Sequence, residues 1–504
     1  MERASPLPLL LLCAAIAAAS PLRALPQDPA KGGKPATPTQ STPKRPNFVF
    51  VQLEGTGAGW SSTSVAMDDR LPDAKNTFAI TPNLEALAKD GTRFSDFYVS
   101  APRCTPARAT FLTGISAAKL KMTYVNEGGQ ERRGGGAGGG RNGGGGGGQR
   151  RNQAPDTSAE DESGQTRLLP PRSTPEMPAA ITTVAEMLKQ SGYATAHFGK
   201  WHVGRQAPSA HGFDEHDGPN TNQGPGRDPK PNPEQAAAIT DKGLAFAKAQ
   251  KDAGVPFYLQ LSHYGGGSAE ESSADTRQKL AQQIRSAREK AMWQAAILHE
   301  VDGHIGRLLA GLGELGLDES TYVFVSFDHG MSGRNSNAPL SGGKGSVREG
   351  GVRVPLLVRG PGVARGVSSR VRGSGADLLP TIADFAGIKQ LPDGVEGGSL
   401  AAVLHGDAKA EVARPREDFV VHFPHYDLGN GGPASAIWLG DHKLIRCYED
   451  GSVRLYDLSK DLGESKDLAA SMPEKKAELE KLLDEYLRAI DAAMPTKNPA
   501  YAGK

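Results

Sequence analysis

Residues 100–114 contain the side chains best suited to chemistry in this sequence. Cys104 stands just ahead of an apolar run that predicts a short helix, with Pro106 suited to the first turn and Gly114 to the end. Arg108 lies one turn further along that helix. Backbone N–H groups and the helix dipole favour an anion at a helix N-terminus, so a sulfur nucleophile would be activated there. A buried core cysteine beside a surface arginine is the ordinary alternative.

Further polar residues each stand just past the end of a predicted strand. The strands are apolar runs at residues 47–53, 193–198, 256–262 and 322–327, and the residues that follow them are Glu54, His202, His263 and Asp328. Residues 54–59 also form a glycine-dense turn. In open α/β sheets, ligands bind at the carboxyl ends of the strands. We therefore expect these side chains to gather at one edge of a sheet.

The alternation of strands and helices predicts an α/β fold, in which helices flank a large mixed, mostly parallel sheet. Helices are expected at residues 82–90, 183–190, 234–250 and over most of 275–315, and a strand at 93–99 leads to Cys104. Thr81 is expected to cap the first of these helices. Thr183 and Glu186 form a capping box for the second.

The pattern changes after about residue 405. Short strands around Val420, Ile437, Leu444 and Leu455 predict a small antiparallel sheet. An amphipathic helix follows, capped by Ser471 with Glu474, and its apolar stripe consists of Leu479, Leu482, Leu483, Tyr486, Leu487 and Ile490. We therefore expect a catalytic domain at residues 47–405 and a C-terminal α+β subdomain at 406–504.

Three segments are expected to lie outside the packed core. Residues 1–24 predict a secretory signal peptide, because Arg3 precedes an apolar run at 9–19 that is too short to span a bilayer. The protein is then exported, periplasmic or secreted, without a stable membrane anchor; an uncleaved anchor is the alternative. Residues 25–46 predict a disordered linker, and residues 127–153 a flexible glycine- and arginine-rich insertion. A net charge of +1 and the lack of aromatic residues in that insertion argue against a nucleic-acid partner.

The sequence Cys-Thr-Pro-Ala-Arg at residues 104–108 fits the pattern Cys-x-Pro-x-Arg and resembles the motif of the type I sulfatases, in the alkaline-phosphatase superfamily. Residues 199–204, Gly-Lys-Trp-His-Val-Gly, and residues 343–355 resemble two more motifs of that family. The resemblance extends from about Asn47 to the C-terminus and implies an alkaline-phosphatase-like fold. It also implies a maturation partner, the formylglycine-generating enzyme, which oxidises the cysteine to formylglycine. This aldehyde hydrates to a gem-diol.

The resemblance implies roles for the residues around position 104. The gem-diol derived from Cys104 supplies the hydroxyl that attacks sulfur, and its second hydroxyl later expels sulfate. Arg108 would steady the diol, while Lys200 and Lys344 would bind the sulfate oxygens.

The same resemblance assigns two histidines to the reaction. His202 would interact with the diol and help to break down the intermediate, and His263 would contact the substrate oxygen and protonate the leaving group. Glu349 and Arg353 are expected to fix a loop and a strand rather than touch substrate. Lys443 and residues 422–426 either reach the rim of the pocket or are ordinary strand and loop residues.

The family also holds a divalent cation, usually calcium, with two consecutive aspartates after the first strand and a later Asp-Asn or Asp-His pair. Asp328 and His329 fit the later pair, and the residue derived from Cys104 belongs to the same site. Oxygen-rich ligation suits calcium, and the metal would clamp the sulfate and lower the pKa of the diol.

The early pair of metal ligands departs from the family pattern. Glu54 and Gly55 stand where the two aspartates belong. Glu54 can still reach a metal, but Gly55 has no side chain to ligate with. Water, Gln52 or the pair at residues 68–69 could fill the gap, and a weaker calcium site or a site for another cation is the further alternative.

These motifs predict an exported sulfatase that hydrolyses O-sulfate esters of a carbohydrate or another small molecule. A phosphodiester or phosphonate monoester hydrolase of the same superfamily is one alternative. A catalytically weakened relative that binds sulfated glycans is another. The joint presence of Cys104, Arg108, Lys200, His202 and Lys344 argues against the last of these.

Overall fold

The computed structural model describes residues 45–502, with gaps at 56–62, 64, 70, 72–79, 126–165, 222–231, 266–270, 284–288, 333–336, 408 and 428–431. The predicted signal peptide, the linker up to residue 44 and the glycine- and arginine-rich insertion lie outside the described residues. Among the described residues, no helix has both the length and the apolar character that crossing a membrane requires. Arg45–Lys504 form a single unit, and the predicted domain boundary at residue 405 stays a prediction.

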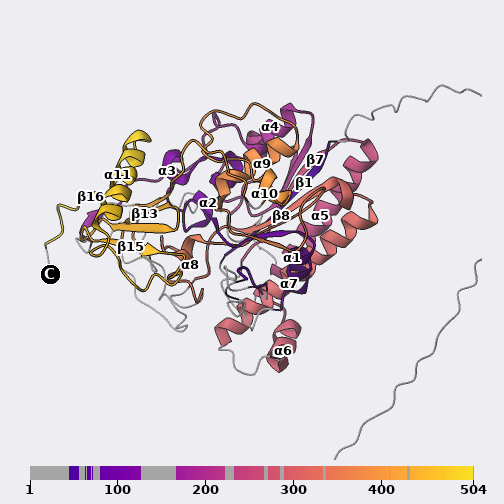
Figure 1. Ribbon diagram of the computed structural model, residues 1–504. Coiled ribbons are helices and arrows are strands. Elements are labelled where there is room, and N and C mark those ends of the chain that lie inside the picture. The colour runs from indigo at the N-terminus through magenta and orange to yellow at the C-terminus, as the bar shows by residue number, and fades with distance from the viewer. Residues whose placement is uncertain are drawn as a thin grey trace, which may run out of the picture. The chain divides into compact units, whose positions relative to one another are not determined.

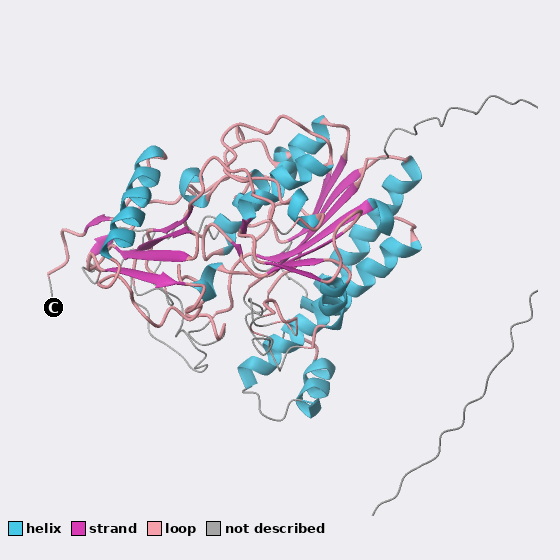
Figure 2. Ribbon diagram, viewed as in Figure 1, coloured by secondary structure: helices cyan, strands magenta, loops and turns pink. Residues whose placement is uncertain are grey.

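An eight-stranded sheet forms the centre of this unit (Figures 1 and 2). Its strands, in spatial order, are β10 (Val367–Ser369), β2 (Thr92–Phe94), β9 (Leu356–Arg359), β8 (Thr321–Phe327), β1 (Asn47–Leu53), β7 (Phe257–Ser262), β5 (Ala194–Gly199) and β6 (Glu215–His216). Strand β9 runs antiparallel to both of its neighbours, and every other pair in the sheet is parallel. The predicted mixed, mostly parallel sheet is therefore confirmed.

Strand β1 lies in the middle of the sheet, between β8 and β7. All seven of its residues are buried. A parallel strand covered by helices on both faces cannot alternate polar and apolar residues, which explains the continuous apolar sequence. Phe48 stacks on Tyr322 of β8, with ring centroids 5.8 Å apart, and Phe50 packs against Phe111, in the segment that follows Cys104.

Helices cover both faces of the sheet (Figure 1). One face carries α1 (Pro82–Lys89), α5 (Asn232–Ala253) and α7 (Glu289–Glu314), with α6 (Ala274–Gln283) packed on α7. The other face carries α2 (Cys104–Thr113), α4 (Val184–Gln190) and α9 (Leu378–Phe385). Three short helices lie elsewhere in the described part of the chain: α3 (Ala117–Leu120), α8 (Glu349–Val352) and α10 (Ala401–Leu404). The capping box predicted for α4 is present, with Thr183 and Glu186 bonded to each other's backbone N–H groups.

Three local predictions differ from the structure in whole or in part. Thr81 is the N-cap residue of α1, as predicted, but its side chain makes no capping hydrogen bond; the carboxylate of Asp302, on α7, accepts the backbone N–H groups of Asn83 (3.0 Å) and Leu84 (2.8 Å) instead. The strand expected at residues 93–99 is divided into β2, which belongs to the main sheet, and β3 (Phe97–Tyr98), which pairs with β11 (Gly373–Ser374); Arg353 Nε donates to the intervening Ser95 carbonyl at 2.7 Å. The last helix, α11 (Pro473–Ala489), has Met472 rather than Ser471 at its N-cap.

The C-terminal residues form the predicted antiparallel sheet. Its strands are β12 (Phe419–Phe423), β13 (Ala434–Leu439), β14 (His442–Cys447) and β15 (Val453–Asp457), hydrogen-bonded in that order. Alternate residues of β13 face opposite ways, so Trp438 packs into the main core while Ile437 packs against Leu483 and its neighbours on α11. Two small pairs, β3 with β11 (Gly373–Ser374) and β4 (Leu168–Leu169) with β16 (Thr496–Lys497), complete the strands.

Candidate active site

The carboxyl ends of four neighbouring strands meet at one edge of the main sheet. Leu53 pairs with Phe327, and Ser262 pairs with both Gln52 and Gly199. The polar residues directly after these strand ends are Glu54, Lys200, His263 and Asp328. The sheet register therefore brings together side chains that lie up to 274 positions apart in the sequence, at the edge where the sequence predicted them.

Cys104 is the first residue of α2, as predicted. Arg103 is the N-cap in extended conformation, and Gly114 ends the helix with φ at 69°, a left-handed conformation that glycine adopts without strain. The thiol is buried and makes no disulfide. Burial raises the pKa of the Cys104 thiol, but Lys200 and Lys344 hold it well below its ordinary value. The site therefore stabilises negative charge at position 104.

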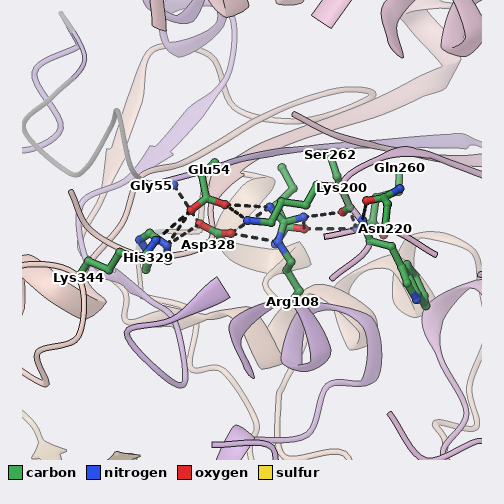
Figure 3. A network of polar contacts seen from close by, with 12 residues as sticks. Glu54, Gly55, Arg108, Lys200, Asn220, Gln260, Ser262, Asp328, His329 and Lys344 are labelled. Carbon is green, nitrogen blue, oxygen red and sulfur yellow. Dashed lines mark hydrogen bonds and ion pairs between the residues drawn. The ribbon is translucent and has the colours of Figure 1, made fainter. Parts of the chain in front are cut away.

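Two buried carboxylates, Glu54 and Asp328, face three cationic side chains at this position (Figure 3). Arg108 Nη2 lies 2.9 Å from Asp328 Oδ2 and 3.7 Å from Glu54 Oε2. Lys200 forms an ion pair with Glu54 Oε2, and Lys344 Nζ lies 3.4 Å from Glu54 Oε1. Burial raises the pKa of the Glu54 carboxyl, but Lys200 and Lys344 lower it well below its ordinary value.

Arg108 is held from several directions at the base of the site (Figure 3). Its Nε donates to Asp328 Oδ2 at 3.0 Å, and its Nη1 donates to the Lys200 carbonyl at 2.8 Å and to Gln52 Oε1 at 3.3 Å. The Gln52 amide also contacts Gln260 behind it. Because its oxygen is engaged with Arg108, Gln52 is a support for the arginine rather than a substitute for a metal ligand.

The loop that carries Lys200 and His202 is fixed by Asn220 and by strand β7. Gly199, the last residue of β5, has φ at 96°, and a Cβ there would lie 2.1 Å from the Ser262 carbonyl oxygen. Asn220 Oδ1 accepts the Trp201 N–H, and the Asn220 carbonyl accepts the His202 N–H, both at 2.9 Å. His202 itself has φ at 56°, a strained conformation for a residue with a Cβ. Burial lowers the pKa of the His202 ring below its ordinary value, while the charge of Cys104 and a side-chain hydrogen bond to it act in the opposite direction.

Lys344 reaches the site from a loop that is bonded to the start of α2. The N–H of Gly345 donates to the Pro102 carbonyl at 3.0 Å, two residues before Cys104, and the Lys344 N–H donates to the Met331 carbonyl at 3.1 Å. Burial lowers the pKa of the Lys344 ammonium, but the charges of Glu54 and Cys104 raise it above the ordinary value. Lys344 therefore stays charged at neutral pH.

His263 lies at the same sheet edge and lines a small cavity with Glu54 and Tyr264. Its backbone N–H donates to the Gln52 carbonyl at 2.9 Å, while Nδ1 of its ring has no partner among the described residues. Burial, with a smaller effect from His304, lowers the pKa of His263 to about 3. The ring is therefore neutral above acidic pH, and it would have to take up a proton on substrate binding to act as an acid.

Four buried residues could hold a metal ion: Glu54, Cys104, Asp328 and His329. Their candidate ligand atoms all lie within 4.8 Å of one another. His329 Nε2 is 3.0 Å from Glu54 Oε1 and 3.5 Å from Asp328 Oδ1. Burial lowers the pKa of His329, but Asp328 and Glu54 help to raise it to about 9, so its ring is a strong base for a proton or a cation. Two carboxylates and an imidazole at these distances fit a divalent cation.

Gly55 has no room for any side chain. A Cβ at this position would lie 1.9 Å from the His329 carbonyl oxygen and 2.5 Å from His329 Nδ1. Of the residues that the sequence offered in place of the missing carboxylate, Asp69 is exposed and forms an ion pair with Arg93 at the surface. Neither Asp69 nor Asp68 belongs to the described group of candidate metal ligands.

Lys443 and His422, for which the sequence left open either a place at the rim of the pocket or an ordinary structural role, are buried core residues. Lys443 is buried between Glu349 (2.9 Å) and Glu464 (2.7 Å). His422 bonds Ser435 Oγ at 2.6 Å and the Ala493 carbonyl at 3.0 Å. Of the two interpretations that the sequence left open for them, the structural one holds. Glu349 and Arg353 form a buried ion pair at 3.2 Å, as expected for residues that fix a loop.

Two further residues that make contacts near Cys104 carried no signal in the sequence. One is Asn220, which holds the Lys200 loop. The other is Asp427, which accepts both Nε and Nη2 of Arg103 and also packs against Gly345, where a Cβ would lie 2.4 Å from the Asp427 carboxyl carbon. An asparagine or aspartate in a loop usually indicates a turn. Only the folded chain reveals these long-range partners.

Comparison with known proteins gives consistent matches. The chain matches the family described as Sulfatase over residues 46–388. It is 28% identical to the mouse (Mus musculus) steryl-sulfatase over 610 aligned positions, which cover 97% of this chain and 86% of that protein. It is 27% identical to the ulvan-active sulfatase of Formosa agariphila over 405 positions, which cover 72% of this chain and 66% of that protein.

Solved structures share the fold. The crystal structure of Ps i-CgsB in complex with k-i-k-neocarrahexaose superposes with a TM-score of 0.66 at 19% sequence identity, covering 88% of this chain and 92% of that one. At this identity the similarity concerns the fold. Together with the strand order, it confirms the predicted alkaline-phosphatase-like α/β fold.

Proposed function

This chain belongs to the sulfatase family of sulfuric ester hydrolases, and we propose that it is an exported enzyme that hydrolyses O-sulfate esters of a sulfated carbohydrate. Residue 104 is the nucleophile, after conversion of its thiol to formylglycine. The observation that carries the proposal is the buried excess of positive charge around Cys104. Arg108, Lys200 and Lys344 face it, and the described residues supply only the carboxylates Glu54 and Asp328 against them.

A sulfate ester is the ligand that such a site favours. Its negative charge is spread over three oxygens, and Lys200 and Lys344 approach the nucleophile from two different loops, so they can hold two of those oxygens. Buried cations that already face carboxylates gain most from an anion that enters with its own charge. Arg108, bonded to Asp328 and to the Lys200 carbonyl, would keep the nucleophile and the first lysine in fixed relative positions.

The chemistry of the proposed step divides among three side chains. The hydrated aldehyde at position 104 supplies a hydroxyl oxygen that attacks sulfur. His202, whose ring interacts with the side chain of Cys104, would take up and return a proton at that position. His263, whose Nδ1 has no partner among the described residues and which lines a cavity beside Glu54, would give a proton to the leaving alcohol.

A divalent cation would bind to Glu54, Asp328, His329 and the converted residue 104. When bound, it would polarise a sulfate oxygen and lower the pKa of the attacking hydroxyl. Calcium is the cation that the family resemblance implies. The contacts of His329 and Gly55 bear on the choice of cation.

The carbohydrate substrate, the export and the maturation step of the proposal each have separate support. The ulvan-active relative and the structure with a bound carrahexaose both concern sulfated carbohydrates by name, which favours a carbohydrate substrate here. Export is supported by the basic residue and apolar run within residues 1–24. Conversion of Cys104 requires a formylglycine-generating enzyme, which is the protein partner expected during maturation.

The proposal is tested by mass spectrometry of the peptide spanning residues 93–122, in protein from a host that matures sulfatases. Formylglycine at position 104 is expected, about 18 Da lighter than cysteine because the thiol sulfur is replaced by oxygen and two hydrogens are lost. Cys104→Ala should fold normally and lose turnover on aryl sulfate and sulfated oligosaccharides by at least about 10³-fold. An unmodified thiol in active protein, or unchanged turnover in Cys104→Ala, would refute the assigned nucleophile. Faster turnover of a phosphodiester or phosphonate monoester than of any sulfate ester would favour the alternative function.

A further inference from the structure

We propose that the metal site of this enzyme prefers a first-row transition-metal dication, such as Zn²⁺ or Mn²⁺, over Ca²⁺. The inference rests on the proposed function, because it concerns the same site. It is carried by the donor atoms of Glu54, Asp328 and His329 and by the packing of Gly55 against His329.

The orientation of the His329 ring is the first observation. Nδ1 lies 2.9 Å from the carbonyl oxygen of Gly330. A carbonyl oxygen only accepts hydrogen bonds, so Nδ1 carries the hydrogen and donates it. Nε2 therefore points at the carboxylates of Glu54 and Asp328, where a bound dication would take the place of its proton. A ring held through one nitrogen by a backbone carbonyl, with the other aimed at two carboxylates, has the arrangement typical of a metal-ligating histidine.

The carboxylates each offer one oxygen to the same point. Glu54 Oε2 is bound by Lys200, while Oε1 lies 3.0 Å from His329 Nε2 and 3.4 Å from Lys344 Nζ. Asp328 Oδ2 is bound by Arg108, and Oδ1 faces His329 Nε2 at 3.5 Å and the N–H of Gly55 at 2.9 Å. Bidentate ligation by either carboxylate would break an ion pair with a buried cation. Both are therefore set to ligate through a single oxygen.

The absence of a carboxylate at position 55 and the position of the His329 ring depend on each other. A Cβ on Gly55 would lie 2.5 Å from His329 Nδ1 and 1.9 Å from the His329 carbonyl oxygen. No side chain at position 55 is compatible with this backbone and ring position. The site therefore has no carboxylate oxygen at position 55, and the imidazole of His329 is fixed directly beside that position.

This donor set suits a transition metal better than calcium. Calcium takes six to eight oxygen ligands, roughly 2.3–2.6 Å away, and often uses bidentate carboxylates. Here the described residues supply two monodentate carboxylate oxygens, one imidazole nitrogen and residue 104. Imidazole and monodentate carboxylates in a compact four-ligand set are the ligands of zinc and related dications.

The test compares metal binding by the full-length mature enzyme and by His329→Asn, which exchanges the imidazole for an amide oxygen. After removal of metal with a chelator, Ca²⁺, Mn²⁺ and Zn²⁺ are titrated separately by isothermal calorimetry. We expect Zn²⁺ or Mn²⁺ to bind at least about tenfold more tightly than Ca²⁺, and His329→Asn to reduce or reverse that preference. His442→Asn, on strand β14 of the C-terminal sheet, is the matched control and should bind all three ions as the parent enzyme does.

A spectroscopic readout separates this inference from the proposed function. Pulsed electron paramagnetic resonance of the Mn²⁺-loaded enzyme should show coupling to an imidazole nitrogen that His329→Asn lacks. Tighter binding of Ca²⁺ than of Mn²⁺ and Zn²⁺, or no nitrogen coupling, would overturn the inference, as would binding of none of the three ions. Hydrolysis of sulfate esters by the same preparation reports on the proposed function separately, whichever cation binds.

Discussion

The protein contains two buried clusters of charged residues that have similar compositions but differ in how well their positive and negative charges match. One, called the catalytic cluster after its proposed role, consists of Glu54, Arg108, Lys200, Asp328, His329 and Lys344. The structural cluster, between α8 and the C-terminal sheet, consists of Tyr98, Glu349, Arg353, Trp438, Lys443 and Glu464. Both are shielded from water, so each charge in them must be compensated by a partner.

The structural cluster compensates its charges internally. Glu349 Oε1 accepts from Lys443 at 2.9 Å and from Trp438 at 3.1 Å, and its Oε2 accepts from Tyr98 at 2.8 Å and from Arg353 at 3.2 Å. Burial raises the pKa of the Glu349 carboxyl, but Lys443 and Arg353 lower it below the ordinary value. The carboxylate thus stays charged and both of its oxygens are used.

The catalytic cluster is not balanced in this way. Among the described residues, three cationic side chains face the carboxylates Glu54 and Asp328, and the ring of His202 beside them interacts with Cys104. A protein does not keep an excess of buried positive charge for stability, because an uncompensated buried ion is costly. The comparison teaches that the imbalance, and not the presence of buried ions, marks the functional site.

The largest expected effect is on turnover, from the variant Lys200→Met. It removes a cation that would hold a sulfate oxygen, and we expect kcat/KM for an aryl sulfate to fall by about 10³-fold or more. Glu54 keeps Lys344, Arg108 and His329 as partners, so the free energy of unfolding should change by less than about 1 kcal/mol. Steady-state kinetics and urea denaturation measure the two quantities.

The matched control for that variant is Lys189→Met, at a lysine whose side chain is 50% exposed in an ion pair with Asp214. An exposed pair contributes about 0–1 kcal/mol, and no change in kcat/KM is expected. If Lys200→Met instead lowered the free energy of unfolding by about 3–5 kcal/mol, the loss expected for a charge removed from the structural cluster, the two clusters would not differ in the way proposed.

The second effect is on stability, from Lys443→Met in the structural cluster. The substitution leaves Glu349 and Glu464 buried without their shared cation, which is expected to cost about 3–5 kcal/mol of unfolding free energy. The folded fraction should retain kcat within a few-fold, since Lys443 does not contact the nucleophile. Urea denaturation followed by fluorescence gives the first number. A large loss of kcat at unchanged stability would instead move Lys443 into the active site.

Much of the fold could be predicted because its determinants are local. The apolar run of β1, the glycine at the end of α2 and the alternation in β13 and β14 each act within one element. The site edge was predictable for the same reason, since a polar residue directly after an apolar strand lies at the sheet's carboxyl end whatever the other strands do. The nucleophile motif also spans only five residues, 104–108.

The remaining features depend on partners that are distant in the sequence. Asp302 caps α1 from more than 200 positions away, so the nearer Thr81 was the only visible candidate. Lys443 is an alternating residue in a strand, a position that usually faces solvent, and it is buried because Glu349 meets it from another segment. The exclusion of a side chain at Gly55 requires knowing where His329 lies.

The third prediction concerns acid stability and buried neutral histidines outside the catalytic cluster. Burial lowers the pKa of His422 to about 4, and burial with His422 and Arg103 lowers that of His425 to about 3. As the pH falls, these two imidazoles take up protons at about pH 6.5 in the unfolded chain but only at lower pH in the folded protein. The contribution of the neutral rings to the free energy of unfolding is therefore complete above about pH 6.5 and decreases as the pH drops below it. Each histidine is expected to lower the free energy of unfolding by up to about 1.4 kcal/mol for each pH unit below about 6.5.

Urea denaturation at pH 7 and pH 5 measures this loss, expected to be about 2 kcal/mol for each buried histidine. His422→Gln, whose amide can still bond Ser435 and the Ala493 carbonyl, should lose less stability between the two pH values than the parent chain does. An equal loss in both proteins would mean that His422 is not buried in its neutral form.

The smallest effect tests whether the two clusters are independent. Ser341 donates a hydrogen bond to Glu464 of the structural cluster and lies three residues before Lys344 of the catalytic cluster. Ser341→Ala should cost about 1 kcal/mol, because Glu464 keeps the Glu349 N–H at 3.0 Å and Lys443 at 2.7 Å. The Lys344 loop keeps its bonds to Pro102 and Met331, so kcat/KM should change by less than about threefold. A tenfold loss of kcat/KM at unchanged stability would show instead that the structural cluster sets the position of Lys344. The two clusters would then be coupled, with the paired charges of the structural cluster keeping a cation of the catalytic cluster in place.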